Sequence, residues 1–132
     1  MSANSNQCTV LVVDDDEMLV ELIEFKLAQK GVVVISSGDG EEGLSMAKEK
    51  KPDLIVLDGM MPGMDGIEVL RILKESTDTK DIPVIMLSAR SQSRDVVGGL
   101  NLGAAEYIAK PFMPEELILK IKRLLGDKCK TG

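Results

Sequence analysis

Polar side chains that can bind a metal ion or an anion follow four short apolar segments of this sequence. They are Asp14, Asp15 and Asp16 after the first segment, Asp58 after the third, Ser88 after the fourth and Lys110 after the fifth. The carboxyl ends of parallel strands meet at one edge of a sheet, where ligands bind in open α/β folds. If the segments are parallel strands, these carboxylates, the hydroxyl and the ammonium lie together at that edge.

The carboxylates at this edge need a cation between them. Asp14, Asp15 and Asp58 would raise one another's pKa by repulsion if they lay close together without one. Mg²⁺ is usually bound through one or two carboxylates and keeps several water ligands, which leaves positions open for phosphate oxygens. Lys110 and Ser88 then offer a positive charge and a hydrogen-bond donor to a phosphoryl group.

Each residue also has a purely structural interpretation. Acids after a strand often cap the next helix, and Asp16 with Glu17 fits that role. A single lysine is usually a solvated surface charge, and a single serine after a strand usually lies in a turn. The clustering of all these groups at one edge favours the functional interpretation.

The apolar segments have the length and composition of buried strands. They cover residues 10–13, 32–35, 54–57 and 84–87, with a weaker fifth at 107–109. Helical periodicity lies between them, as in Leu19, Leu22, Ile23 and Leu27 or in Leu117, Ile118, Ile121, Leu124 and Leu125. Gly31, Pro52 and Pro114 mark helix boundaries. This βα unit, repeated five times, predicts an α/β fold with a parallel sheet between helices.

Composition limits the class of protein. A chain of 132 residues is the size of one domain, and a hydrophobic fraction of 44% with 2% aromatic residues predicts an aliphatic core. The net charge of -6 argues against non-specific nucleic-acid binding, and no segment is apolar over the length of a membrane span. We therefore expect a cytoplasmic protein, in which Cys8 and Cys129 are free thiols and no zinc site forms.

At this point the sequence resembles the receiver domain of bacterial response regulators, the phosphorylated modules of two-component signalling. The matching segments are VLVVDDDE (10–17), DLIVLDGMMPGMDGIEVL (53–70), PVIMLSAR (83–90) and GAAEYIAKPF (103–112). The resemblance implies a doubly wound (βα)5 fold with the flavodoxin-like strand order 2-1-3-4-5. It covers residues 9–125, with 1–8 and 126–132 expected to be flexible ends.

The resemblance also implies a role for each residue at the polar edge. Asp58 is the expected phosphoacceptor. Mg²⁺, or Mn²⁺ in its place, is expected to bind Asp15, Asp58 and the backbone carbonyl of Met60 directly, and Asp14 through a water molecule.

Further positions correspond to the family's switch residues. Ser88, Tyr107 and Lys110 are expected to respond to the phosphoryl group, and the bond between Lys110 and Pro111 matches the family's cis peptide. Ala89 and Arg90 follow the switch serine, and Met60 and Arg90 occupy positions that tune hydrolysis of the phosphoryl group.

Two features depart from the family's pattern. Gly98 and Gly99 fall within the expected fourth helix, where each glycine costs about 1 kcal/mol relative to alanine. That helix is expected to be weakly stable. Ala105 and Glu106 replace the two acids that often precede the family's switch aromatic, which puts dimer contacts through those acids in doubt.

The expected function is phosphoryl acceptance rather than enzymatic turnover. The sequence contains no histidine, so a separate histidine kinase or His-containing phosphotransfer protein must donate the group. An unphosphorylated adaptor is one alternative. A haloacid-dehalogenase-type phosphatase, suggested by the DxD pattern of Asp14 to Asp16, is another, although it leaves Asp58 unexplained. A flavin-binding module is disfavoured because three acids stand where phosphate needs donors.

Overall fold

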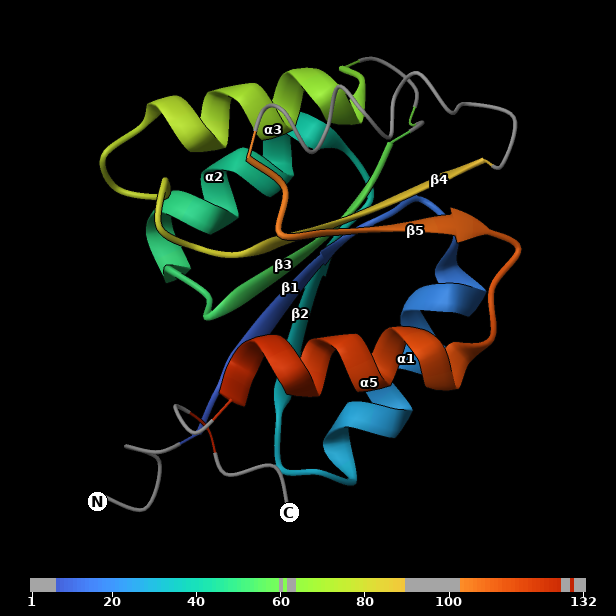
Figure 1. Ribbon diagram of the computed structural model, residues 1–132. Helices are drawn as coiled ribbons and strands as arrows, with labels where there is room; N and C mark the ends of the chain where they lie inside the picture. Colours follow the sequence, from blue (N-terminus) through green and yellow to red (C-terminus); the bar gives the residue numbers. More distant parts are fainter. Residues whose placement is uncertain (1–6, 60, 62–63, 90–102, 127–128, 130–132) are drawn as a thin grey trace.

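The computed structural model describes residues 7–59, 61, 64–89, 103–126 and 129. Its five strands form one parallel sheet in the order β2-β1-β3-β4-β5. The strands are β1 (Thr9–Val13), β2 (Val33–Ser37), β3 (Leu54–Asp58), β4 (Val84–Ala89) and β5 (Glu106–Lys110). The described helices are α1 (Glu17–Ala28), α2 (Gly40–Lys50), α3 (Gly66–Glu75) and α5 (Pro114–Leu125). Figure 1 shows α1 and α5 on one face of the sheet and α2 and α3 on the other. The predicted doubly wound fold and strand order are confirmed.

Two hydrophobic cores lie on the two faces of the sheet. Alternate residues of each central strand supply them: Val12 and Val56 pack toward α1 and α5, whereas Leu11 and Ile55 pack toward α2 and α3. Residues 54–57 of β3 are completely buried, as a central strand between two helical layers requires. This double burial explains why the predicted strands were continuous apolar runs rather than alternating ones.

All strands except β1 extend beyond the predicted apolar runs at their carboxyl ends. The second strand was predicted at 32–35 but lies at Val33–Ser37, because all five residues of β1 pair with it, up to Val13 with Ser37. Likewise Asp58, Ser88 and Lys110 are within the ends of their strands rather than after them. Pairing with the neighbouring backbone continues where the apolar composition has already ended.

Helix boundaries follow the predicted signals. Gly31, with a φ of 79°, lies shortly after α1, and Pro114 is the first residue of α5. Lys51 ends α2 in the left-handed conformation, directly before Pro52. The predicted fourth helix, with Gly98 and Gly99, lies outside the described residues.

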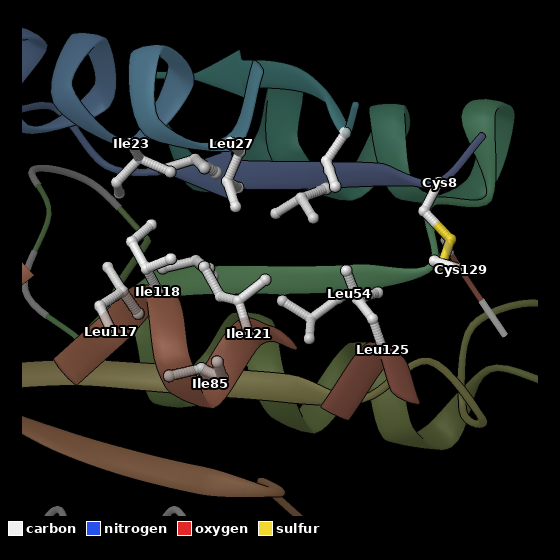
Figure 2. Close-up of a cluster of buried hydrophobic side chains, with 14 of the residues drawn as sticks. Cys8, Ile23, Leu27, Leu54, Ile85, Leu117, Ile118, Ile121, Leu125 and Cys129 are labelled. Atoms are coloured by element: carbon white, nitrogen blue, oxygen red, sulfur yellow. A yellow bond between two sulfur atoms is a disulfide. The ribbon is translucent and has the colours of Figure 1, made fainter. Parts of the chain in front are cut away.

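The prediction that the two cysteines are free thiols is wrong. A disulfide joins Cys8 and Cys129, whose Cα atoms are 5.6 Å apart although 121 positions separate them in the sequence. Figure 2 shows the bond beside Leu54 and Leu125 at the margin of the α1/α5 core. The prediction failed because the fold brings the residue before β1 next to the segment that follows α5.

The ends of the chain are described only in part. The expected flexibility of residues 1–8 and 126–132 stays a prediction for the residues outside the described ranges, while Cys8 and Cys129 are buried. In the described part of the chain, none of the helices has the length and apolar character that crossing a bilayer requires.

Helix α3 begins in close contact with the end of β3. The Gly66 amide donates a hydrogen bond to the Gly59 carbonyl over 3.3 Å. A Cβ atom at Gly66 would collide with the Asp58 carbonyl oxygen and lie 2.7 Å from the Gly59 Cα. The missing side chain of Gly66 therefore lets α3 pack directly against the backbone that carries Asp58.

We expect the substitution Gly66→Ala to lower the free energy of unfolding by about 1–3 kcal/mol, because backbone atoms cannot move aside cheaply. Urea unfolding followed by circular dichroism measures the change. Gly38→Ala is the matched control, since no atom lies within 4 Å of a Cβ at Gly38. Equal unfolding free energies for the two variants would contradict the close contact.

Candidate functional site

The polar residues singled out in the sequence lie at the carboxyl edge of the sheet. Asp14 directly follows β1, Asp58 ends β3, and Lys110 ends β5. The strand registers place Asp58 and Lys110 on the α1/α5 face. Asp58 pairs with Leu87, which packs in the α1/α5 core, and Lys110 pairs with Ala89, which lies two positions further along β4 on the same face. Alternation along the strands thus brings an acid and a base from different strands to the same side.

Lys110 lies between two buried carboxylates. Its Nζ atom is 3.5 Å from Asp14 Oδ2 and 3.6 Å from Asp58 Oδ1. The side chain of Asp14 is 0% exposed and that of Asp58 is 6% exposed, whereas the lysine side chain is 33% exposed. One ammonium therefore faces two acids that are shielded from water.

Burial, and to a smaller extent the negative charge of Asp58, raise the pKa of Asp14 from 3.8 to about 6. Two interactions oppose the rise: a 2.8 Å hydrogen bond from the Asp16 amide to Asp14 Oδ1 and the charge of Lys110. Asp14 Oδ2 is buried and accepts no hydrogen bond from the described residues. The ammonium does not compensate fully for the buried charge, so the site favours an additional cation.

Asp15 completes a cluster suited to a hard divalent ion. One carboxylate oxygen from each of Asp14, Asp15 and Asp58 lies within 4.8 Å of the others. Asp15 is exposed, so the cluster opens to solvent on its side. Oxygen ligands with open positions for water are the set that Mg²⁺ prefers. The buried oxygen of Asp14 without a hydrogen bond fits the same ion.

Asp16 caps the helix that follows it, which is the structural role that the sequence suggested. Its Oδ1 atom accepts hydrogen bonds from the amides of Met18 and Leu19 and caps the amino end of α1. Its carboxylate is thereby used by the helix. The DxD pattern of Asp14 to Asp16 therefore does not provide two free acids for a phosphatase reaction.

Ser88 and Tyr107 lie on the opposite face from Lys110. In the β4–β5 register Ser88 pairs with Ala109 and Met86 pairs with Tyr107, and directly paired residues of parallel strands point to the same side. Met86 and Tyr107 pack in the α2/α3 core, so Ser88 and Tyr107 share that face. Ser88 is 1% exposed and directly follows Leu87, the residue paired with Asp58.

The remaining predicted positions are described only in part. The peptide bond between Lys110 and Pro111 is cis, as expected. Ala89 is the last residue of β4, and its side chain is outside the description. Met60 and Arg90 lie outside the described residues, so their expected contacts stay predictions.

Sequence reasoning missed the glycine contact that positions Asp58. Gly66 follows Asp65, whose side chain accepts hydrogen bonds from the amides of Ile67 and Glu68 and caps α3. The Asp-Gly pair was visible in the sequence as a helix-start signal. Its tight approach to β3 depends on the distance between strand and helix, which the sequence does not display.

A comparison with protein families agrees with this geometry. The chain matches the family model described as "Response regulator receiver domain" over residues 10–122. The chain belongs to the response regulator receiver domain family. As a receiver domain it is a signalling module of two-component systems. Receiver domains bind Mg²⁺ through acidic residues, and the acidic cluster of this chain could hold such an ion.

Two curated relatives illustrate the likeness. The alkaline phosphatase synthesis transcriptional regulatory protein PhoP of Bacillus subtilis is 46% identical over 116 residues, covering 88% of this chain and 48% of that protein. The phosphate regulon transcriptional regulatory protein PhoB of Escherichia coli is 42% identical over 116 residues, covering 88% of this chain and 51% of that protein. The receiver domain thus spans about half the length of these relatives.

Solved structures share the fold over nearly their whole length. A putative response regulator from Chloroflexus aurantiacus has a TM-score of 0.83 and 34% identity, covering 90% of this chain and 98% of that chain. The chemotaxis protein CheY4 of Vibrio cholerae has a TM-score of 0.82 and 30% identity, covering 90% and 99%. Both the five-stranded sheet and the helical layers are therefore typical of receiver domains.

The raised pKa of Asp14 predicts a pH-dependent effect of the substitution Asp14→Asn in the presence of a chelator. The pKa of Asp14 in the folded state lies above 3.8, its ordinary value in the unfolded chain. Protonated Asp14 therefore does not destabilise the folded state below pH 3.8, whereas its buried charge increasingly opposes folding as the pH rises through about 6. Asparagine keeps an acceptor for the Asp16 amide and removes the charge. We expect the variant to be more stable than the wild type by about 1–2 kcal/mol at about pH 7.5.

This advantage should shrink as the pH falls from about 6 to about 4, as measured by urea unfolding across that range. Asp15→Asn is the matched control, because Asp15 is exposed. A variant at Asp14 that is less stable than the wild type at neutral pH would refute the electrostatic interpretation.

Proposed function

We propose that Asp58 is the phosphoacceptor of this receiver domain. We further propose that the donor is a phosphohistidine on a partner histidine kinase or His-containing phosphotransfer protein. One observation carries the proposal: the buried carboxylate of Asp58 lies 3.6 Å from Lys110 Nζ and within 4.8 Å of carboxylate oxygens of Asp14 and Asp15. These 132 residues contain no histidine, so the donor is on another molecule or segment.

In the transfer, a carboxylate oxygen of Asp58 forms a bond to phosphorus while the bond between phosphorus and the donor nitrogen breaks. The electron pair of that bond leaves with the donor imidazole, and Asp58 becomes an acyl phosphate. Lys110 stands beside the attacking oxygen and is positioned to pair with the oxygens of the incoming phosphoryl group. Positioning and charge thus provide most of the catalysis, as is general for phosphoryl transfer.

The acidic cluster is the proposed site of Mg²⁺, for which Mn²⁺ can substitute. Asp15, Asp58 and the backbone carbonyl of Met60 would hold the ion directly, and Asp14 would hold it through a water molecule. When bound, the ion supplies positive charge that stabilises the oxygens of the transferring group. It would also relieve the repulsion that Asp58 exerts on Asp14.

The response to phosphorylation is proposed to pass to the other face of the sheet through β4. Ser88 would move toward the phosphoryl group, and Tyr107 would turn into the space that Ser88 leaves. Support comes from the shared face of these two residues and from the chain continuity between Leu87 and Ser88. The surface that changes is the one formed by the fourth helix, β5 and α5. Switching it from mostly off to mostly on requires about 5.5 kcal/mol of differential stabilisation.

The domain, residues 9–125, is proposed to act as a cytoplasmic signalling module and not as an enzyme with turnover. It takes up one phosphoryl group and passes on a conformational change to a target protein or output domain. Direct contact with nucleic acid is not proposed for the receiver domain, because its net charge is -6. The alternative is an adaptor that is never phosphorylated. Such an adaptor would not explain why the carboxylates of Asp14, Asp15 and Asp58 lie close together.

The phosphoacceptor is tested by incubating the protein with a small phosphodonor and Mg²⁺ and measuring its intact mass. We expect the wild type to gain one phosphoryl group and the variant Asp58→Asn to gain none. Asp78→Asn, in the exposed loop that precedes β4 at the other edge of the sheet, should be modified like the wild type. Phosphorylation of Asp58→Asn, or none of the wild type, would overturn the assignment.

The metal site is tested without phosphoryl transfer by thermal unfolding in increasing Mg²⁺. Binding to the folded state raises the melting temperature of the wild type in a saturable manner. The substitution Asp15→Asn should weaken this response at least about tenfold in Mg²⁺ concentration, because it removes a charged ligand. Glu49→Gln, at an exposed position near the end of α2, is the control and should respond like the wild type. Equal responses of Asp15→Asn and the wild type would count against the site.

A further inference from the structure

A disulfide bond lies at the amino edge of the sheet, at the opposite end of the strands from Asp58. Cys8 directly precedes β1, and Cys129 lies beyond the end of α5. Both residues are buried, with 4% and 5% of their surfaces exposed, and they belong to the α1/α5 core. Figure 2 shows their bond beside Leu54, the first residue of β3, whereas Asp58 is the last residue of that strand.

We propose that Cys8 and Cys129 form a redox-sensitive clasp that fastens the segment after α5 to the start of β1. Closing the clasp joins the two sulfur atoms and releases two protons and two electrons. A low-molecular-weight disulfide such as oxidised glutathione accepts them and becomes two thiols. Opening is the reverse: two thiols of a reductant form their own disulfide, and Cys8 and Cys129 each regain a proton.

The clasp holds the chain after α5 at Cys129. Of the residues after Leu125, the structure describes Gly126, which is exposed, and Cys129, which is buried. The disulfide therefore ties Cys129 covalently to the residue that directly precedes β1. A link over 121 positions also restricts the unfolded chain strongly, because stabilisation by a disulfide grows with the length of the loop it closes.

A metal site made of the same cysteines is less consistent with the structure. The carboxylate of Asp53 lies within 4.8 Å of both sulfur atoms, so the three groups form a possible ligand cluster. However, Asp53 Oδ2 accepts a 2.9 Å hydrogen bond from the Thr9 amide, and the two sulfur atoms are bonded to each other. A bonded pair of sulfurs does not offer the thiolates that a soft metal ion requires.

The surroundings of the clasp make its reduction dependent on local opening. A reducing thiolate must reach one sulfur directly, and both cysteines are buried. The nearby carboxylate of Asp53 also repels an approaching thiolate. In the cytoplasm proposed above, where disulfides are usually transient and redox-sensing, the clasp would close under oxidising conditions and reopen slowly. This cellular timing rests on the proposed location, whereas the chemistry of the pair does not.

The test compares the folded protein after treatment with oxidised glutathione and after treatment with dithiothreitol. Alkylation followed by intact mass measurement should find no free thiols in the first sample and two in the second. Reduction should lower the melting temperature by roughly 10 °C. It should also speed the removal of C-terminal residues by carboxypeptidase. None of these measurements depends on phosphorylation, so failure of the clasp leaves the proposed function untouched.

The double variant Cys8→Ala with Cys129→Ala is the control. Its melting temperature should be insensitive to dithiothreitol and close to that of the reduced wild type. Two alkylated thiols after oxidation, or equal melting temperatures of the oxidised and reduced wild type, would overturn the clasp. Protection of the reduced thiols from alkylation by added Zn²⁺, without disulfide formation, would overturn it in favour of a metal site.

Discussion

At the carboxyl edge of the sheet, two buried carboxylates lie beside a single ammonium group. The resulting excess of negative charge determines what the site can bind. Asp14 and Asp58 are both largely removed from water, while Lys110 lies within 3.6 Å of each and remains partly exposed. Burial and the charge of Asp58 raise the pKa of Asp14 to about 6. An arrangement of this kind is unfavourable without a further cation, and it is suited to bind one together with a phosphoryl group.

The fold holds these charges in place through backbone contacts rather than through side-chain salt bridges alone. Asp58 is fixed by the ladder between β3 and β4, and α3 packs against its carbonyl group through Gly66. Alternation along the strands puts Lys110 on one face and Ser88 with Tyr107 on the other. In the proposed function, a phosphoryl group on Asp58 would be sensed on the α1/α5 face, and its effect would pass to the other face through β4.

Much of this structure was predictable because local composition reflects burial. Continuous apolar runs such as residues 54–57 identified central strands, and the rule that ligands bind at the carboxyl ends of strands identified Asp14, Asp58 and Lys110 as neighbours. The edge strand was placed less well, because pairing with β1 carries it through polar residues to Ser37. The tight contact of Gly66 and the bond between Cys8 and Cys129 escaped prediction, since both depend on distances between segments.

The most direct test of the central claim is anomalous diffraction from crystals of the protein grown with Mn²⁺. We expect a strong anomalous peak at the carboxyl edge of the sheet, about 2.1 Å from carboxylate oxygens of Asp15 and Asp58. Asp14 should face the ion across a water molecule, and Lys110 should remain beside Asp58. Crystals that show no peak among these carboxylates at millimolar Mn²⁺ would contradict the claim that the acidic cluster exists to hold a divalent ion.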